Sequence, residues 1–286
     1  MSALRIIRAG GYIIQRGGAS GAPGRKRVRL RAGKRVRLPA GRPDTVPDVA
    51  IARVVSVNTG HGRDEEWAGR LKRTAIDKRP VAGPVAVGRL GLAGDDQVDK
   101  PDHGGYEQAL YAYAREDLDW WVERLGRELA SGTFGESITT SGLEVTGGVI
   151  GEVWRLGSAV VQVTSPRIPC AVFAGWMDEH QWVKRFAAAG RVGAYLRVLE
   201  EGQVSAGDPV EILSRPATRL TIAESVRAYY GDVDLMRRLL LVQGRSSKWD
   251  EIALSVLGRP GAIAEDAGAA AGPGPAGMGV PGAPGR

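Results

Sequence analysis

The residue with the clearest capacity for chemistry is Cys170, the only cysteine of the chain. It ends the stretch SAVVQVTSPRIPC at 158–170, whose valine-rich first half is typical of a β-strand. Pro166 and Pro169 cannot donate to a sheet ladder and favour extended backbone before them, so the sulfur should lie on a stiff turn at a strand end. Arg167 and a helix start just after the cysteine would both favour the thiolate, which attacks or binds a metal. A buried, inert thiol is the alternative.

Two glycine-punctuated loops carry further polar groups. The first is LGLAGDDQVDKPDHGG at 90–105, which ends in His103-Gly104-Gly105. Glycine there can take a positive φ or let a ligand approach the backbone. The second is SGTFGESITTSG at 131–142. Two roles are equally compatible with His103: it could hold its own loop in place, or it could contact a bound group directly.

The charge of the chain is concentrated at its N-terminus. Residues 1–43 contain 12 of the 39 Lys and Arg residues and no Asp or Glu, which leaves 27 basic against 32 acidic residues elsewhere. Nucleic-acid binding is therefore not expected except through this basic arm. No apolar run is long enough for a membrane helix. A single cysteine allows no internal disulfide, which fits a reducing, cytoplasmic location.

The elements that must position the loops follow from the hydrophobic pattern. Helices are predicted at 115–130, with the Trp120-Trp121 pair at the core and its rim, and at 178–189, capped by Asp178. Counting about seven or eight short strands from Ala50, the pattern predicts a β-dominated α+β fold, a barrel-like domain with inserted helices. The strands are expected at 50–57, within 71–89, at 109–113, as a hairpin of 149–157 and 158–165, and at 194–202 and 208–215.

Composition divides the chain into four parts. A basic arm at 1–47 and an Ala/Gly/Pro tail at 259–286 are expected to be disordered. The barrel domain spans 48–214. Three short amphipathic helices follow at 215–258, each begun by Thr, Asp or Ser and closed by Gly231, Gly244 or Gly258. The 286 residues are enough for one large domain with such an appendage.

These motifs, in this order, resemble the MOSC domain, named for the C-terminal domain of molybdenum cofactor sulfurases. The resemblance is to the stand-alone YiiM-like branch, which carries a three-helix C-terminal extension. It covers about residues 50–213, and the helices to Gly258 are similar to the extension. One departure is Ser137, where this family's loop commonly has Asn. The matching stretches are GDDQVDKPDHGG with ALYAY, GTFGESIT, SPRIPC and VKRFAAAGRVGAYLRVLEEGQVSAGDPV.

The resemblance implies a MOSC-type barrel of short mixed strands that binds a molybdenum-pterin cofactor, with Cys170 as the protein ligand to the metal. One thiolate is enough, because the pterin dithiolene supplies two sulfurs and oxo groups the rest, whereas a structural zinc would need four protein ligands. A solvated surface role stays open for Arg191 and Arg197. The candidates for holding the phosphate and pterin are Lys100, His103, Gly104, Gly105, Phe134, Gly135, Glu136, Ser137, Thr139, Arg167, Arg191 and Arg197.

The implied reaction is two-electron reduction of N-hydroxylated compounds, such as hydroxylaminopurines and amidoximes, to the amine or amidine and water. Glu136, Asp95 or His103 could supply protons. The electrons should come from a separate flavoprotein or ferredoxin-type reductase, because the chain has no Gly-rich nucleotide fingerprint and no cysteine cluster.

Two other readings stay open at this point. One is sulfur transfer through a persulfide on Cys170, and the other is a carrier that holds the cofactor without turnover. Pyridoxal phosphate is not expected, since no lysine is marked for a Schiff base. The sequence leaves open whether the chain forms a homodimer.

Overall fold

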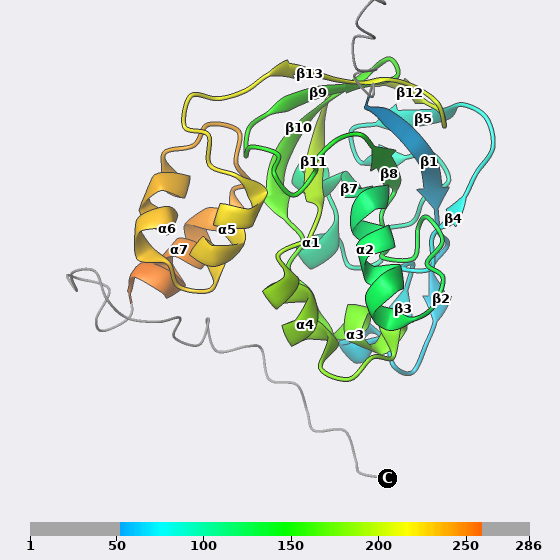
Figure 1. The fold of residues 1–286 in the computed structure, drawn as a ribbon, viewed down its shortest axis with the longest axis horizontal. Helices are drawn as coiled ribbons and strands as arrows, with labels where there is room; N and C mark the ends of the chain where they lie inside the picture. The colour runs from blue at the N-terminus through cyan, green and yellow to red at the C-terminus, as the bar shows by residue number, and fades with distance from the viewer. Residues whose placement is uncertain (1–51, 259–286) are drawn as a thin grey trace, which may run out of the picture. The chain divides into compact units, whose positions relative to one another are not determined.

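The computed structural model describes residues 52–258, so the predicted basic arm at 1–47 and the tail at 259–286 lie outside the described residues. An eight-stranded sheet forms the centre, in the order β13-β9-β10-β11-β7-β8-β1-β4 (Figure 1). Only β7 and β8 are parallel; the other neighbours are antiparallel. The strands are β1 (Arg53–Thr59), β4 (Arg79–Pro80), β7 (Leu110–Ala114), β8 (Ile138–Ser141), β9 (Val153–Leu156), β10 (Ala159–Pro166), β11 (Ala194–Glu200) and β13 (Val210–Ser214).

The predicted β-dominated α+β fold is confirmed, but the sheet is not a closed barrel. Its order ends at β13 and β4. The start of β1 meets the chain before β13 at an isolated antiparallel bridge between Arg53 and Pro209. Three backbone hydrogen bonds of 2.8–2.9 Å, including Val54 N to Asp208 O, join the two segments there. Two small sheets complete the strands: β12 (Gly202–Val204) with β5 (Val85–Gly88) and β6 (Gly91–Leu92), and β2 (Arg63–Asp64) with β3 (Arg73–Thr74).

The predicted hairpin is present, and β9 pairs with β10 around Gly157 and Ser158. The segment at 131–142, in contrast, is not only a loop. Its end forms β8, which lies between β7 and β1 in the main sheet. The sequence ITTS is short and mostly polar, so it lacks the alternation of apolar and polar residues that predicts a strand. Ile138, Thr139 and Thr140 are nevertheless buried by the neighbouring strands.

Two helices differ from the sequence expectation. Helix α2 (Arg115–Leu125) ends early because Gly126 takes the left-handed conformation, with φ of 64°. The helix expected at 178–189 starts only at Trp182, as α4 (Trp182–Ala189). Asp178 does not cap it: it terminates the preceding α3 (Ala171–Met177) with φ of 50°. The remaining short helices of this part are α1 (Lys100–His103), η1 (Gly69–Leu71) and η2 (Tyr106–Gln108).

An aromatic cluster joins α2, α3 and α4 to the loop before β8. Phe134, Phe173 and Phe186 are fully buried and pack edge to face, with ring centroids 5.0–5.7 Å apart. Trp121 and Trp182 pack against them. Edge-to-face packing of large rings stabilises the fold beyond simple area burial. The cluster therefore fixes α3, the helix that begins immediately after Cys170. As expected, Trp121 is in the core and Trp120 at its rim.

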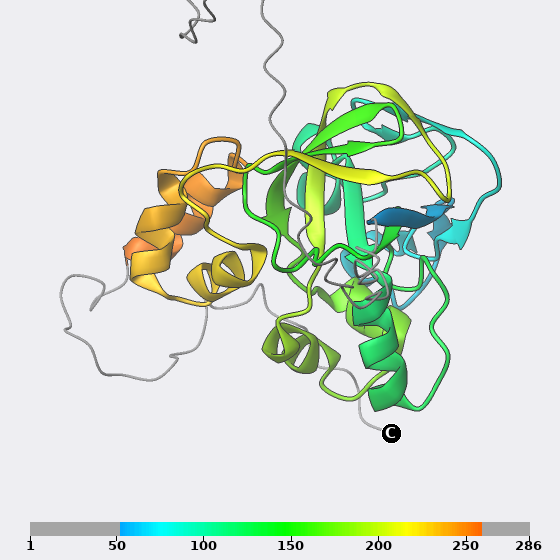
Figure 2. The same cartoon turned by 45° about the horizontal axis from the view of Figure 1, so that its top comes forward.

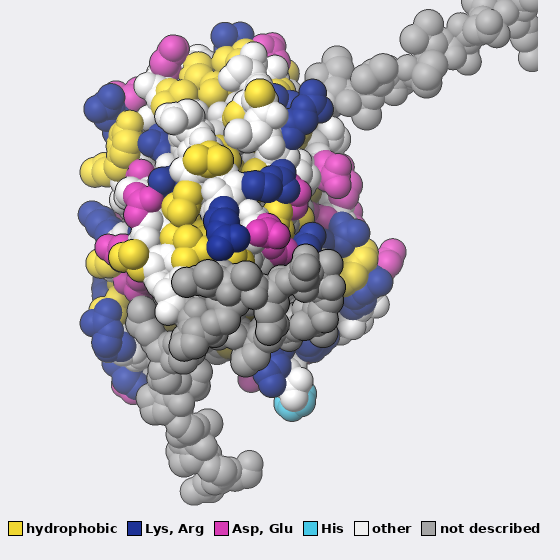
Figure 3. All heavy atoms as spheres, turned by 90° about the vertical axis from the view of Figure 1, so that its left-hand side faces the viewer, with side chains coloured by type: hydrophobic (Ala, Val, Ile, Leu, Met, Phe, Trp, Pro, Cys, Tyr) yellow, Lys and Arg dark blue, Asp and Glu magenta, His cyan; other side chains and the backbone are white. Residues whose placement is uncertain are grey.

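The C-terminal helices are α5 (Ile222–Tyr229), α6 (Val233–Leu240) and α7 (Lys248–Leu257), grouped beside β10 (Figures 1 and 2). Figure 3 views the side on which they lie; basic and acidic side chains are interspersed with apolar ones there. Thr221 forms a capping box with Glu224, and Asp232 caps α6 through Leu235 N. No helix within residues 52–258 has the length and apolar character to cross a bilayer.

Replacing the N-cap of α5 tests whether this helix depends on its capping box. Thr221→Ala removes the acceptor for Glu224 N, so we expect a loss of about 1 kcal/mol in the free energy of unfolding. The measurement is urea denaturation followed by circular dichroism. Thr218→Ala, at an exposed position in the preceding connection, is the matched control and should leave the midpoint unchanged. Equal midpoints for the two variants would contradict the role of the cap.

Candidate functional site

Cys170 lies where the sequence places it, on extended backbone between the end of β10 and the first residue of α3. Its φ and ψ are −123° and 173°, and the thiol is half-buried and free. Its carbonyl accepts the Ala174 N–H at 3.0 Å, which starts α3. Phe173, anchored in the aromatic cluster, holds the helix in place. The sulfur is therefore presented from a rigid turn.

Arg167, three residues before the cysteine, is a buried cation without a carboxylate partner. Only 5% of the residue is exposed. Its guanidinium carbon lies 4.4 Å from the Phe173 ring centroid and 5.1 Å from that of Tyr111. Its Nε has no hydrogen-bond partner, and the guanidinium forms no ion pair within residues 52–258. Because an unpaired buried charge is costly, such a group is typical of a site that receives an anion.

His103 joins this site through Tyr195 of β11, with 3.2 Å between His103 Nδ1 and Tyr195 Oη. Burial, and then the positive charges of Arg167 and Lys248, lower the pKa of His103 to about 3. The imidazole is therefore neutral at pH 7. It can take part in a hydrogen bond, but in this state it does not carry the extra proton that a cationic acid would deliver, so the expectation that His103 supplies protons gains no support.

Gly104 and Gly105 shape the His103 turn around Gln97. Gly105 has φ of 75°, and its N–H donates to Gln97 Oε1 at 2.9 Å. A Cβ on Gly104 would come within 2.6 Å of the same oxygen. Close packing against Gln97 thus requires glycine at 104, and the positive φ favours glycine at 105.

Two polar atoms that the sequence did not single out also lack partners near Tyr195. Ser165 Oγ and Asp99 Oδ1 are buried without a hydrogen bond. Ser165 is the cross-strand partner of Tyr195, and the Asp99 carboxylate is close enough to influence the Tyr195 hydroxyl. Burial, and next the neighbouring Asp102 carboxylate, raise the pKa of Asp99. Asp99 belongs to the same Asp-rich loop as Asp95. Its place in that loop was the only sequence feature that could have pointed to it.

Glu136 builds the second loop and does not face the site. It is fully buried, and its carboxylate accepts Gly132 N at 2.6 Å, Phe134 N at 3.0 Å and Thr139 Oγ1 at 3.0 Å. Burial raises its pKa. With its oxygens occupied by its own loop, Glu136 holds that loop in shape, and the expectation that it donates protons to a substrate gains no support.

The other candidates of this loop are also committed to the fold. Ser137 Oγ accepts Tyr111 N at 2.9 Å, and Thr139 Oγ1 accepts Asn58 Nδ2 at 3.1 Å. Phe134 is part of the aromatic cluster. Gly135 alone lies beside the site: a Cβ there would be 3.6 Å from Arg167 Nη1.

The structure does not bring Arg191 and Arg197 to Cys170. Arg191 pairs with Asp117 and lies over the Trp120 ring, 4.9 Å from its centroid. Arg197 donates to the carbonyl oxygens of Gly244 and Arg245. Both guanidinium groups therefore have structural partners, and the expectation that they pair with a phosphate gains no support.

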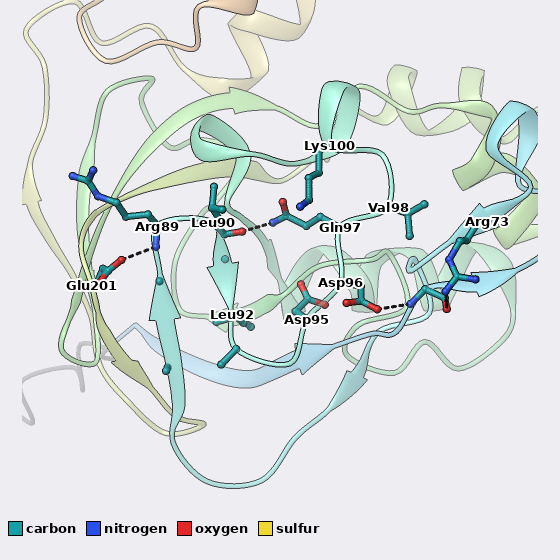
Figure 4. Close-up of a pocket in the computed structure, with 15 residues that line it drawn as sticks. Arg73, Arg89, Leu90, Leu92, Asp95, Asp96, Gln97, Val98, Lys100 and Glu201 are labelled. Atoms are coloured by element: carbon teal, nitrogen blue, oxygen red, sulfur yellow. Dashed lines mark hydrogen bonds between the residues drawn. The ribbon is translucent and has the colours of Figure 1, made fainter.

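Lys100 and Asp95 line a different feature, a pocket of about 860 Å³ next to β5 and β6 (Figure 4). Cys170, Arg167 and His103 do not line it. Asp95 forms an ion pair with Lys78 and accepts Gly60 N at 2.9 Å, so it is not free to donate a proton. The pocket walls include Arg73, Arg89, Asp96 and Glu201.

The described residues contain no group of three or more His, Cys, Asp or Glu side chains arranged to hold a metal ion. Protein ligation at this site would rest on Cys170. The groups the structure brings together there are Cys170, Arg167, His103, Tyr195, Ser165 and Asp99.

A sequence profile of the MOSC domain matches residues 99–211. An uncharacterized protein of Bacillus subtilis, YflK, is 37% identical over 199 residues, which cover 68% of this chain and 90% of YflK. A protein of Gibberella moniliformis named reductase is 28% identical over 68% of this chain, but the match spans only 35% of that longer protein. The crystal structure of YiiM from Geobacillus stearothermophilus superposes with a TM-score of 0.61 at 31% identity, covering 72% of this chain and 99% of that one.

The low pKa of His103 makes stability depend on pH. As the pH falls from 7 to 4, the unfolded chain takes up a proton at this residue near pH 6.5 and the folded chain does not, so stability is lost with falling pH. We expect the wild type to lose about 1–3 kcal/mol more than His103→Gln over this range, allowing for partial solvent screening. Denaturant titrations at each pH measure this loss. His180→Gln, at an exposed histidine, should behave as the wild type does.

The hydrogen bonds of the Glu136 carboxylate should stabilise the folded state. Glu136→Gln replaces an acceptor with an amide NH₂ facing backbone donors, so we expect a loss of about 2–4 kcal/mol in the free energy of unfolding. Glu144→Gln, in the following connection, is the control, since that side chain has no hydrogen bond within residues 52–258. A Glu136 variant as stable as the control would show that the loop does not depend on these bonds.

Proposed function

The chain belongs to the MOSC domain family, and on this premise we propose that it binds a molybdenum-pterin cofactor through Cys170 and reduces N-hydroxylated compounds. The observation that carries the proposal is the unpaired guanidinium of Arg167 beside a free, half-buried thiol. A family member with a soft sulfur ligand and a buried cation suits a cofactor that combines a metal with anionic groups. The name of the fungal relative, reductase, supports the reaction type.

The residues at the site fit this group. Cys170 Sγ would be the protein ligand to the metal, and a single thiolate suffices where the rest of the coordination comes from the cofactor itself. The Arg167 Nε, without a partner, would face anionic oxygens. When bound, the cofactor would supply the two-electron chemistry and the acceptor for oxygen. The chain's part is to hold that group and to manage charge and protons around it.

Conversion of an N-hydroxylamine to an amine and water consumes two electrons and two protons. Asp95 and Glu136 are occupied by structural bonds, and His103 is neutral. Burial raises the pKa of Asp99, and one of its oxygens has no partner, so Asp99 is the carboxyl group that we assign as proton donor. His103, hydrogen-bonded to Tyr195, would orient the substrate or cofactor as a neutral group.

The electron donor would be a separate flavoprotein or ferredoxin-type reductase. Transfer of sulfur through a persulfide on Cys170, or carriage of the cofactor without turnover, would use the same sulfur and the same cation. Metal content and turnover separate these three functions, because only the reductase needs both.

Substitution of the two central residues tests the proposal. After reconstitution with the cofactor, Cys170→Ala should lose bound molybdenum and reduction of a hydroxylaminopurine by at least about 100-fold, and Arg167→Met should weaken cofactor binding by about 10- to 100-fold. Lys184→Met, at an exposed position of α4, is the control. Molybdenum is measured by elemental analysis, and turnover with a chemical reductant.

The outcomes separate the functions. A Cys170→Ala variant that keeps both metal and turnover would overturn the assignment of the sulfur as ligand. Persulfide on Cys170 in protein that binds no molybdenum would favour sulfur transfer, and tight cofactor binding without turnover under any reductant would favour a carrier.

A further inference from the structure

The end of the connection between α6 and α7, residues 244–247, is bound to the part of the chain that carries His103. Glu107, in η2, is the main contact. Its Oε2 accepts Ser246 Oγ at 2.7 Å, Ser247 N at 2.8 Å and Ser247 Oγ at 2.9 Å. These bonds lower the pKa of Glu107 even though burial opposes its charge. One carboxylate thus joins two segments about 140 residues apart in sequence.

Strands of the main sheet also hold this segment. Arg197 of β11 donates to Arg245 O at 2.8 Å and to Gly244 O, and Ser246 N donates to Thr164 O of β10 at 3.1 Å. Ser246 is fully buried. The hydrogen bonds of Arg197 therefore attach the start of α7 to the sheet, beside the site.

Lys248, the first residue of α7, spans the His103 turn. Its Nζ donates to Asp102 O at 3.1 Å and to Gln108 Oε1 at 2.8 Å. Asp102 precedes the His103-Gly104-Gly105 turn in the sequence, and Gln108 follows it. Because Gly105 has a positive φ and glycine has wide conformational freedom, the turn needs external contacts to keep one arrangement.

We propose that Lys248 is a positioning residue that clamps the His103 turn, so that α5–α7 complete the candidate site. The importance of this clamp for catalysis rests on the proposed function. The contacts that form the clamp do not require the cofactor. Lys248 also places a second positive charge near His103, in addition to Arg167, while Tyr195 provides the hydrogen-bond contact. The Lys248 ammonium is in turn faced by Asp99, Asp102, Glu107 and Glu251.

Lys248→Met keeps most of the side-chain stem and removes the charge and the donors. We expect the Gly104 and Gly105 amides to exchange hydrogen several-fold faster, because the turn loses its external contacts, and the pKa of His103 to rise, because a nearby cation is gone. Lys248→Arg, which keeps charge and donors, should restore both. Lys184→Met is the matched control. The measurements, on the full chain without cofactor, are hydrogen exchange by mass spectrometry and imidazole ¹⁵N shifts by NMR.

The results distinguish this inference from the proposed function. Unchanged amide exchange and His103 pKa in Lys248→Met would overturn the clamp, even if the wild-type protein proves to be a molybdenum-dependent reductase. Changes in both, with recovery in Lys248→Arg, would establish the clamp even if the wild type reduces no N-hydroxylated compound. In the loaded enzyme, Lys248→Met should lower kcat or raise KM for the substrate, whereas Lys184→Met should change neither.

Discussion

A buried guanidinium without a counter-charge beside a free thiol is the constraint on which the site depends. Arg167 lies between two aromatic rings, which offset part of the cost of burial through cation–π contact. They do not replace a hydrogen-bonded anion. Many proteins would pair such a group with Asp or Glu. This chain instead directs a buried carboxylate whose charge reaches Arg167, that of Glu136, to backbone donors. The positive charge is thereby left available for a ligand.

The rest of the domain keeps this arrangement in place. Phe173 contacts the guanidinium on one side and the aromatic cluster on the other, so that α3 and Cys170 are held relative to Arg167. Glu136 shapes the turn that brings Gly135 alongside. Close packing of large side chains leaves little freedom for adjustment. The site is therefore a consequence of a packed core and its neighbouring loops, and not of a flexible surface segment.

The sequence was informative where local rules decide the structure. Proline restricts its neighbours, so the strand end and turn before Cys170 could be predicted. Thr221 and Asp232, which cap α5 and α6, likewise predicted the starts of these helices. It was misleading where partners are distant. Strand β8 exists because β1 and β7 flank it, and Asp178 ends a helix because the chain must turn before Trp182. The roles of Arg191 and Arg197 depend on acidic and carbonyl partners that no local pattern reveals.

The same reasoning explains why polar residues in a recognisable motif were assigned too readily to ligand contact. A loop that approaches a bound group must itself be rigid, and its backbone N–H groups need acceptors. Glu136, Ser137, Thr139 and Gln97 satisfy that need. Most of the motif therefore holds the loops in shape, whereas some polar groups at the site are left without partners. Arg167 and Asp99 are such groups, and the first of them was the cation closest in sequence to the only cysteine. Unsatisfied burial alone does not mark a binding group, because Nε1 of Trp182 in the aromatic cluster and Nε1 of Trp249 in α7 also lack partners. Arg167 is distinguished by having, in addition, a buried positive charge beside the Cys170 thiol.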